Sequence, residues 1–125
     1  MEPRPDIVLL GAEWRPRALL RAQLIEEGFD VVATDTWPDA RRHLRPGMKP
    51  RLVIVDTHEL ADAQQVLADL RVLMKPDRVL VLSAMSTVPE DEIQRLGFRA
   101  VKRPIAIEQI VDAVTRIIRD DSSET

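Results

Sequence analysis

Three short, wholly apolar runs constrain the fold more than any other feature of this sequence. They are Ile7–Leu10, Leu52–Val55 and Val79–Leu82. A run of this length without polar alternation is typical of a strand that is buried on both faces, as in a parallel sheet. Apolar residues at helical spacing fill the stretches between the runs. Such an alternation predicts right-handed crossovers with helices on both faces of the sheet.

Two weaker strands and five helices complete the predicted alternation. The weaker strands are expected at 29–33 and 98–102. The helices are expected at 14–27, 37–46, 59–74, 88–96 and 105–118. This order predicts a flavodoxin-like α/β fold, a doubly wound sheet of five parallel strands in the order 2-1-3-4-5 with five helices on its two faces.

Length and composition indicate one domain. The chain has 125 residues, of which 45% are hydrophobic, enough for one compact core and too few for two ordinary domains. We expect residues 1–119 to form the domain. The polar segment 120–125 is predicted to be a flexible C-terminal tail or the start of a linker.

The charge balance and the missing cysteines exclude several classes of function. A formal net charge of -3 gives no excess that would draw the chain to nucleic acid or to an anionic membrane. Without cysteine there is no disulfide framework, no thiolate zinc site and no cysteine nucleophile. The chain has no apolar run of the roughly 20 residues that span a bilayer and no secretory signal at its N-terminus. We therefore expect a cytoplasmic protein whose partner is a protein or a small ligand.

Polar side chains follow the predicted buried strands. Asp56 ends the strand at 52–55, and Ser83 ends the strand at 79–82. In doubly wound sheets, ligands bind beyond the carboxyl ends of the strands near the switch point, here between the first and third strands. Residues 11–13 should lie at the same edge. The glycines form no phosphate-cradling motif, and we assign no catalytic role, so we do not expect an enzyme.

From residue 6 to 119, the order and spacing resemble the receiver domain of two-component response regulators. The segment 49–56 resembles the strand that ends on the phosphate acceptor of that family, so the resemblance makes Asp56 the candidate acceptor. Ser83 and Ala84 resemble the hydroxyl and small-residue pair of the fourth strand. In the family, that hydroxyl hydrogen-bonds the phosphoryl group.

The candidate for the conserved lysine of receivers is ambiguous. Pro104 resembles the proline that follows this lysine, which places Arg103 at its position. Lys102 takes the position only if one extra residue precedes the proline. Arg103 and Lys102 are both candidates for a phosphate-sensing cation, although a planar guanidinium and a point charge are not equivalent.

Other positions depart from the receiver pattern. Receivers place two acidic residues after the first strand to hold a divalent ion, and here those positions are Gly11 and Ala12, followed by Glu13. Mg²⁺ prefers several hard oxygen ligands in octahedral geometry, and Glu13 and Asp56 are the only candidates. The position of the switch aromatic is Ala100, or Arg99 in the other register. The resemblance is therefore to an atypical, degenerate receiver, with no cofactor expected.

Asp56 has three possible roles. Its carboxylate could cap the following turn, accept phosphate, or pair with Lys102 or Arg103 to hold the loops in one state. Next to it, His58 is expected to be solvated. Trp14 and Trp37, near the starts of two helices, could anchor a partner, but we expect partial burial against the loops.

The leading hypothesis is a signalling module that acts by protein–protein interaction without Mg²⁺-supported phosphorylation. The resemblance implies a kinase, an effector or a second copy as partner, through the face of the fourth helix, fifth strand and fifth helix. The apolar stripe at 107–118 is wider than one sheet face needs, which suggests a homodimer contact. One alternative is a phosphoacceptor receiver that uses Asp56 and Mg²⁺. Another is a small-ligand-binding flavodoxin-like domain, with its pocket above Gly11.

Overall fold

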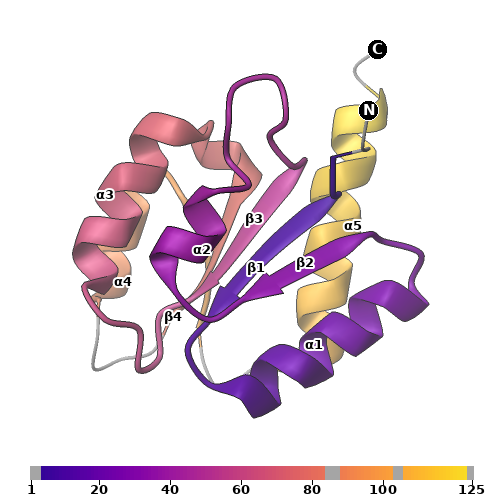
Figure 1. Ribbon diagram of the computed structural model, residues 1–125, viewed down its shortest axis with the longest axis horizontal. Helices are drawn as coiled ribbons and strands as arrows, with labels where there is room; N and C mark the ends of the chain where they lie inside the picture. The colour runs from indigo at the N-terminus through magenta and orange to yellow at the C-terminus, as the bar shows by residue number, and fades with distance from the viewer. Residues whose placement is uncertain (1–3, 84–87, 103–105, 124–125) are drawn as a thin grey trace.

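A computed structural model of the protein describes residues 4–83, 88–102 and 106–123, and its strands form a parallel sheet (Figure 1). The strand order is β2-β1-β3-β4-β5. The strands are β1 (Ile7–Gly11), β2 (Val31–Thr34), β3 (Leu52–Asp56), β4 (Val79–Ser83) and β5 (Arg99–Lys102). All neighbouring strands pair in parallel, so the predicted fold class and strand order are confirmed.

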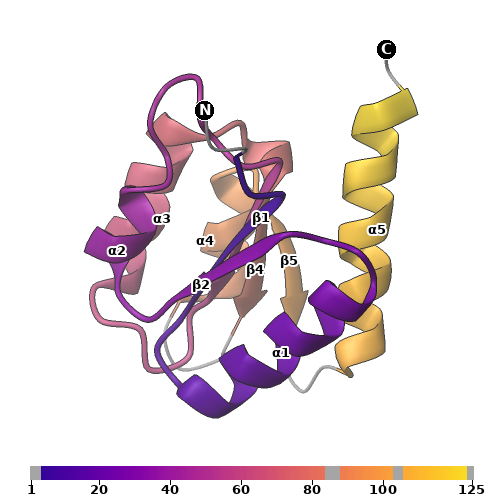
Figure 2. The ribbon, with the colours of Figure 1, turned by 45° about the vertical axis from the view of Figure 1, so that its right-hand side comes forward.

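Helices cover both faces of the sheet, as Figures 1 and 2 show. They are α1 (Trp14–Glu26), α2 (Trp37–Arg41), α3 (Ala63–Leu73), α4 (Glu90–Arg95) and α5 (Ile107–Ser123), with a short 3-10 helix at Pro76–Arg78. Residues of α1 and α5 share one hydrophobic cluster, and residues of α2, α3 and α4 belong to the other. All residues of β1, β3 and β4 are buried, because these strands lie between the two helical layers.

Two elements differ from the sequence prediction near the first crossover. The strand expected at 29–33 begins at Val31, because a turn after α1 takes up the residues before it. Gly28 has a left-handed φ of 97°, and the amide of Phe29 donates to the carbonyl of Leu24. This turn is a common way to end a helix, and it takes up the residues before β2. The helix expected at 37–46 ends at Arg41, after which the backbone forms short turns.

The loop after β3 is longer than the sequence predicted. A helix was expected from residue 59, but α3 begins at Ala63. Glu59 and Asp62 have φ values of 58° and 54°, a left-handed conformation that interrupts a right-handed helix. Glutamate and aspartate carry no strong signal for this conformation, so the sequence did not reveal the loop. At the other end of the chain, α5 continues to Ser123, beyond the predicted domain boundary at residue 119.

The apolar stripe of α5 is used within the chain itself. Ile110, Val111, Val114, Ile117 and Ile118 are each at most 7% exposed. They belong to a hydrophobic cluster that also contains residues of α1 and of the sheet, so the stripe packs against both. The inference that this stripe leaves residues over for a dimer contact is therefore wrong.

The buried face of α3 provides a test of the core. Leu67 is fully buried, whereas Val72 on the same helix is 85% exposed. We expect Leu67→Ala to lower the free energy of unfolding by about 2–5 kcal/mol, because the substitution leaves a cavity. The control Val72→Ala should change it by less than about 0.5 kcal/mol. Urea denaturation followed by circular dichroism measures both, and similar losses would contradict the packing described above.

Candidate functional site

The sheet register brings the predicted polar residues to one edge. Gly11 on β1 is the register partner of Asp56 on β3, and Asp56 is the partner of Leu82 on β4. The next residue of β4, Ser83, is the partner of Lys102 on β5. Gly11, Asp56, Ser83 and Lys102 each end their strands, so the predicted grouping at the carboxyl edge of the sheet is confirmed.

Asp56 is buried and takes part in a turn. Asp56 is 8% exposed. Its Oδ1 accepts a hydrogen bond from the backbone N–H of His58 at 3.1 Å. A carboxylate that accepts from the amide two residues later forms an Asx-turn, which corresponds to one of the three roles considered for Asp56 from the sequence. This bond orients the carboxylate at the start of the β3–α3 loop.

Thr57 ties the same loop to β4. Its backbone N–H donates to the carbonyl of Leu82 at 3.1 Å, and its hydroxyl donates to the same carbonyl at 3.3 Å. Thr57 is fully buried, so both bonds are shielded from water. The base of the loop that follows Asp56 is therefore held against the neighbouring strand.

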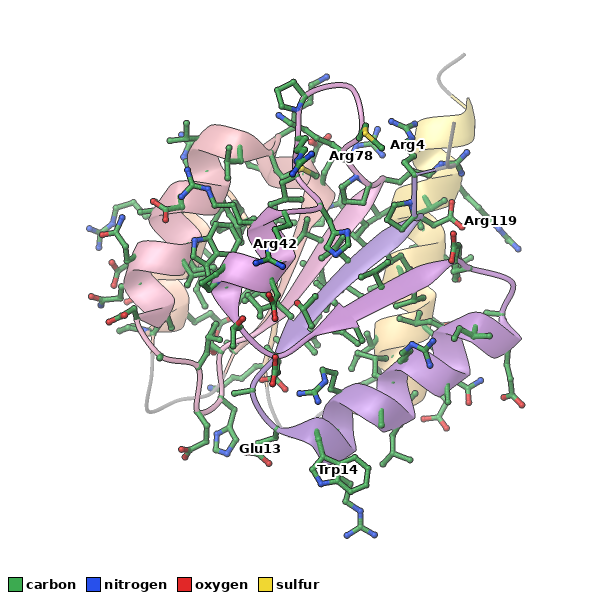
Figure 3. All side chains as sticks on the ribbon, viewed as in Figure 1. Arg4, Glu13, Trp14, Arg42, Arg78 and Arg119 are labelled. Atoms are coloured by element: carbon green, nitrogen blue, oxygen red, sulfur yellow. The ribbon has the colours of Figure 1, made fainter. Side chains whose placement is uncertain are left out.

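An ion-pair contact joins the loops that follow β1 and β3. The Nε2 of His58 lies 2.7 Å from the Oε1 of Glu13, with side chains that are 38% and 43% exposed. Figure 3 labels Glu13 at this end of the molecule, in the loop between β1 and α1. Sequence reasoning expected a solvated His58 and did not find this contact. The strand order 2-1-3 was a signal for it, because these two loops follow adjacent strands.

Arg17 contacts the position where receivers carry acidic residues. Its Nη1 donates to the carbonyl of Gly11 at 2.6 Å. A Cβ added at Gly11 would lie 3.6 Å from the Cβ of Asp56 and 3.8 Å from the Cβ of Arg17, which is ordinary van der Waals contact. Gly11 therefore leaves no large empty space, and a side chain could be placed there without a clash at Cβ.

A pocket of about 330 Å³ lies beside Asp56, between the first turns of α1 and α5. It is lined by Glu13, Arg15, Pro16, Leu19, Asp56, Leu82, Ile107 and Ile110. A second pocket of about 360 Å³ is lined by Ala12 and by residues of the β2–α2 and β3–α3 regions. Gly11 lines neither pocket, so the structure does not place a pocket directly above Gly11 as predicted. The pocket beside Asp56 lies against α1 and α5 instead.

The candidate phosphate-sensing residues differ in exposure. Ser83 is 4% exposed, whereas Lys102 lies exposed at the end of β5. Arg103, Ala84 and Pro104 lie outside the described residues. Within 4–83, 88–102 and 106–123, no group of three or more histidine, aspartate or glutamate side chains is arranged to hold a metal ion. No helix in these ranges is long and apolar enough to cross a membrane.

The two tryptophans have different environments. Trp37 is partly buried and donates from Nε1 to Oδ2 of Asp69 at 3.2 Å, as expected for a residue packed at a helix start. Trp14 is 70% exposed, so its predicted partial burial is wrong. It lies at the start of α1 on the side that faces away from the sheet (Figure 3).

The bond between Asp56 and the loop can be measured by substitution. Asn keeps an oxygen that accepts from the His58 N–H, whereas Ala removes it. We expect Asp56→Ala to lower the free energy of unfolding by about 1 kcal/mol more than Asp56→Asn does. Urea denaturation of the two variants gives the difference. Equal losses would mean that the bond to His58 does not contribute to stability.

The sequence matches no protein-family model and no curated protein. Solved structures with a similar fold include the receiver domain of Francisella response regulator 1452, with a TM-score of 0.80 and 16% identity over 94% of this chain and 99% of that chain. A response regulator receiver protein from Pseudomonas putida has a TM-score of 0.75 and 19% identity, over 93% and 99% of the two chains. An adenylate cyclase structure from Rhodopirellula baltica has a TM-score of 0.71 and 19% identity, over 93% and 88%. At these identities the likeness establishes the fold, which is that of response-regulator receiver domains.

Proposed function

We propose that this chain is a receiver-like signalling module that acts by protein–protein interaction and does not depend on Mg²⁺-supported phosphorylation. The receiver fold supports the signalling role, and the residues at the carboxyl edge of the sheet support the second part. We propose no catalytic activity. A cytoplasmic location, expected from the sequence, belongs to the same proposal.

The observation that carries the proposal is the contact between Glu13 and His58. Glu13 is the one carboxylate that follows β1 near Asp56, and its Oε1 lies 2.7 Å from the His58 Nε2. A divalent ion would have to compete with this imidazole for Glu13. Gly11 and Ala12 offer no side-chain oxygen, so the donor set does not fit a divalent ion, which requires several hard oxygen ligands.

Contacts within the chain already hold the loops that phosphorylation rearranges in a switching receiver. The amide of His58 binds Asp56, Thr57 binds the carbonyl of Leu82, and Arg17 binds the carbonyl of Gly11. Each contact joins a loop to a strand or a helix at the carboxyl edge. A partner that recognises one conformation of the module binds only if that conformation is populated. Loops held by contacts within the chain keep one conformation populated without a phosphoryl group, so the module presents the same surface at all times.

The predicted partner surface is the face of α4, β5 and α5. β5 is an edge strand, and its residues Arg99 and Lys102 are exposed. Large apolar side chains that are exposed in the described residues lie elsewhere, so this face is polar and charged. Such a surface suits a transient contact with a kinase or an effector, because polar interfaces of modest size form and dissociate readily.

A titration with engineered controls tests the proposal. Wild-type protein, titrated with Mg²⁺ and then beryllofluoride, should give the same calorimetric trace as Asp56→Asn, with no adduct by native mass spectrometry. The double variant Gly11→Asp/Ala12→Asp restores the two missing carboxylates, and a Cβ at position 11 meets only ordinary contacts. We expect this variant to bind Mg²⁺ through the added oxygens and Asp56.

The opposite result has a definite meaning. If wild-type protein binds Mg²⁺ and forms an adduct that Asp56→Asn abolishes, the chain is a phosphoacceptor receiver, with Ser83 and Lys102 or Arg103 as the phosphate-sensing groups. If the double variant binds Mg²⁺ while wild-type protein does not, the loss of the acidic pair accounts for the missing metal site.

The pocket beside Asp56 favours a second candidate function, the binding of a small ligand. Its volume of about 330 Å³ falls within the range of ligand sites, and it combines apolar residues of α1 and α5 with the carboxylates of Asp56 and Glu13. The guanidinium of Arg15 also lines this pocket, so its mixed charges suit an apolar ring that carries both a cationic and an anionic group. Tryptophan should then raise the melting temperature of wild-type protein and leave that of Ile107→Gln unchanged. No shift in either protein would remove this candidate.

A further inference from the structure

The outer surface of α1 is unusually apolar. Five large hydrophobic side chains are exposed in the described part of the chain, and three of them lie on this helix. Trp14 is 70% exposed, Leu19 is 55% exposed and Ile25 is 43% exposed. Figure 3 shows Trp14 projecting from the start of α1 away from the sheet. Exposed apolar residues gathered on one element indicate an interaction surface more strongly than scattered ones.

Trp14 and Ile25 belong to a stripe along the helix, whereas Leu19 lines the pocket beside Asp56. Trp14, Ala18, Ala22 and Ile25 are separated by four, four and three positions, the spacing that places side chains on one face of a helix. All four are exposed. The opposite face holds Leu20 and Leu24, which are buried in the core. α1 is therefore apolar on two faces, and the chain itself covers one of them.

The charges on α1 are arranged against the helix dipole. Arg15 and Arg17 lie in its first half and Arg21 lies just past its middle, whereas Glu26 ends the helix and Glu27 follows. The first turn contains no acidic residue, and the last turn contains no basic residue. A helix is stabilised by the opposite arrangement, with acidic residues at its N-terminus and basic residues at its C-terminus. The distribution of charges along α1 therefore does not stabilise the helix through its dipole, and it needs another explanation.

We propose that the outer face of α1 binds the same face of a second copy of the chain, with the two helices antiparallel. A two-fold axis then places the basic N-terminal half of each helix beside the acidic C-terminal half of the other. Arg15 and Glu26 are eleven positions apart, about three helical turns, so both lie on the same flank of the stripe. In this arrangement Arg15 faces Glu26 of the partner subunit, and the two dipoles also run in opposite directions.

The apolar stripe fits the same arrangement. Ala18 and Ala22 lie near the middle of the helix, where small side chains allow two helices to approach closely. Trp14 and Ile25 lie at its two ends, so the tryptophan of each copy covers the isoleucine end of the other. In a parallel arrangement Arg15 of one copy and Glu26 of the other would lie eleven positions apart along the helix axis, so they could not pair. The charge pattern therefore selects the antiparallel contact.

The contact is small, and it is separate from the proposed function. With 13 residues, α1 is about 20 Å long, so a pair of such helices forms an interface at the low end of the usual size range. We therefore expect a dimer that dissociates on dilution. It uses neither Asp56 nor the face of α4, β5 and α5, so it can fail or succeed independently of the proposed function.

Charge reversal tests the antiparallel geometry directly. Sedimentation velocity over a concentration series should show dimers of wild-type protein. Arg15→Glu and Glu26→Arg should each weaken the dimer tenfold or more, because like charges then face each other twice. A mixture of the two single variants should restore association to about the wild-type strength, because every facing pair in the mixed dimer is attractive again. A parallel contact or another face would not give this recovery.

Further variants separate this surface from others. Trp14→Ala should weaken the dimer at least tenfold, because tryptophan is among the residues that contribute most to the stability of interfaces. On α3, Val72→Ser and Arg71→Glu change an exposed apolar residue and an exposed charge far from α1, and they should leave the dimer unchanged. Circular dichroism checks that each variant is folded. A wild-type protein that stays monomeric at all concentrations, or a dimer that is insensitive to the α1 substitutions, would overturn the proposal.

Discussion

The burial of β1, β3 and β4 on both faces is the constraint on which the rest of the structure depends. Ile7, Ile54 and Leu80 have essentially no contact with water, and each strand is covered by helices on both sides. A strand in this position cannot shift along its neighbours without moving apolar side chains out of the core. The carboxyl ends of the strands are therefore fixed at one edge, and their polar residues meet there.

At that edge, the chain uses its own polar groups to hold the loops. Asp56 binds the amide of His58, and the imidazole of His58 contacts Glu13. These two contacts connect the loops after β1 and β3 in the part of the fold where receivers bind a metal ion and a phosphoryl group. Arg17 adds a cation that binds the backbone of Gly11. Side chains and backbone groups of the chain thus bind one another at this edge of the sheet.

α1 and α5 have opposite relations to solvent. The apolar residues of α5 between Ile110 and Ile118 are buried, because α5 packs against both the sheet and α1. α1 contributes Leu20 and Leu24 to the same cluster but still carries an apolar stripe on its outer face. A wide apolar face in a sequence therefore does not by itself identify an interaction surface. What decides is how much of that face the neighbouring elements cover.

The sequence by itself determined the fold class, the strand order and the placement of Asp56 and Ser83 at the carboxyl edge. It could do so because short apolar runs and helical spacing are local patterns, and parallel strands align their ends. Only the tertiary structure decided that His58 contacts Glu13, that α5 is buried and that Trp14 is exposed. It also revealed the left-handed residues Glu59 and Asp62, which delay the start of α3. These features depend on which loops and helices become neighbours in space, and no local pattern encodes that.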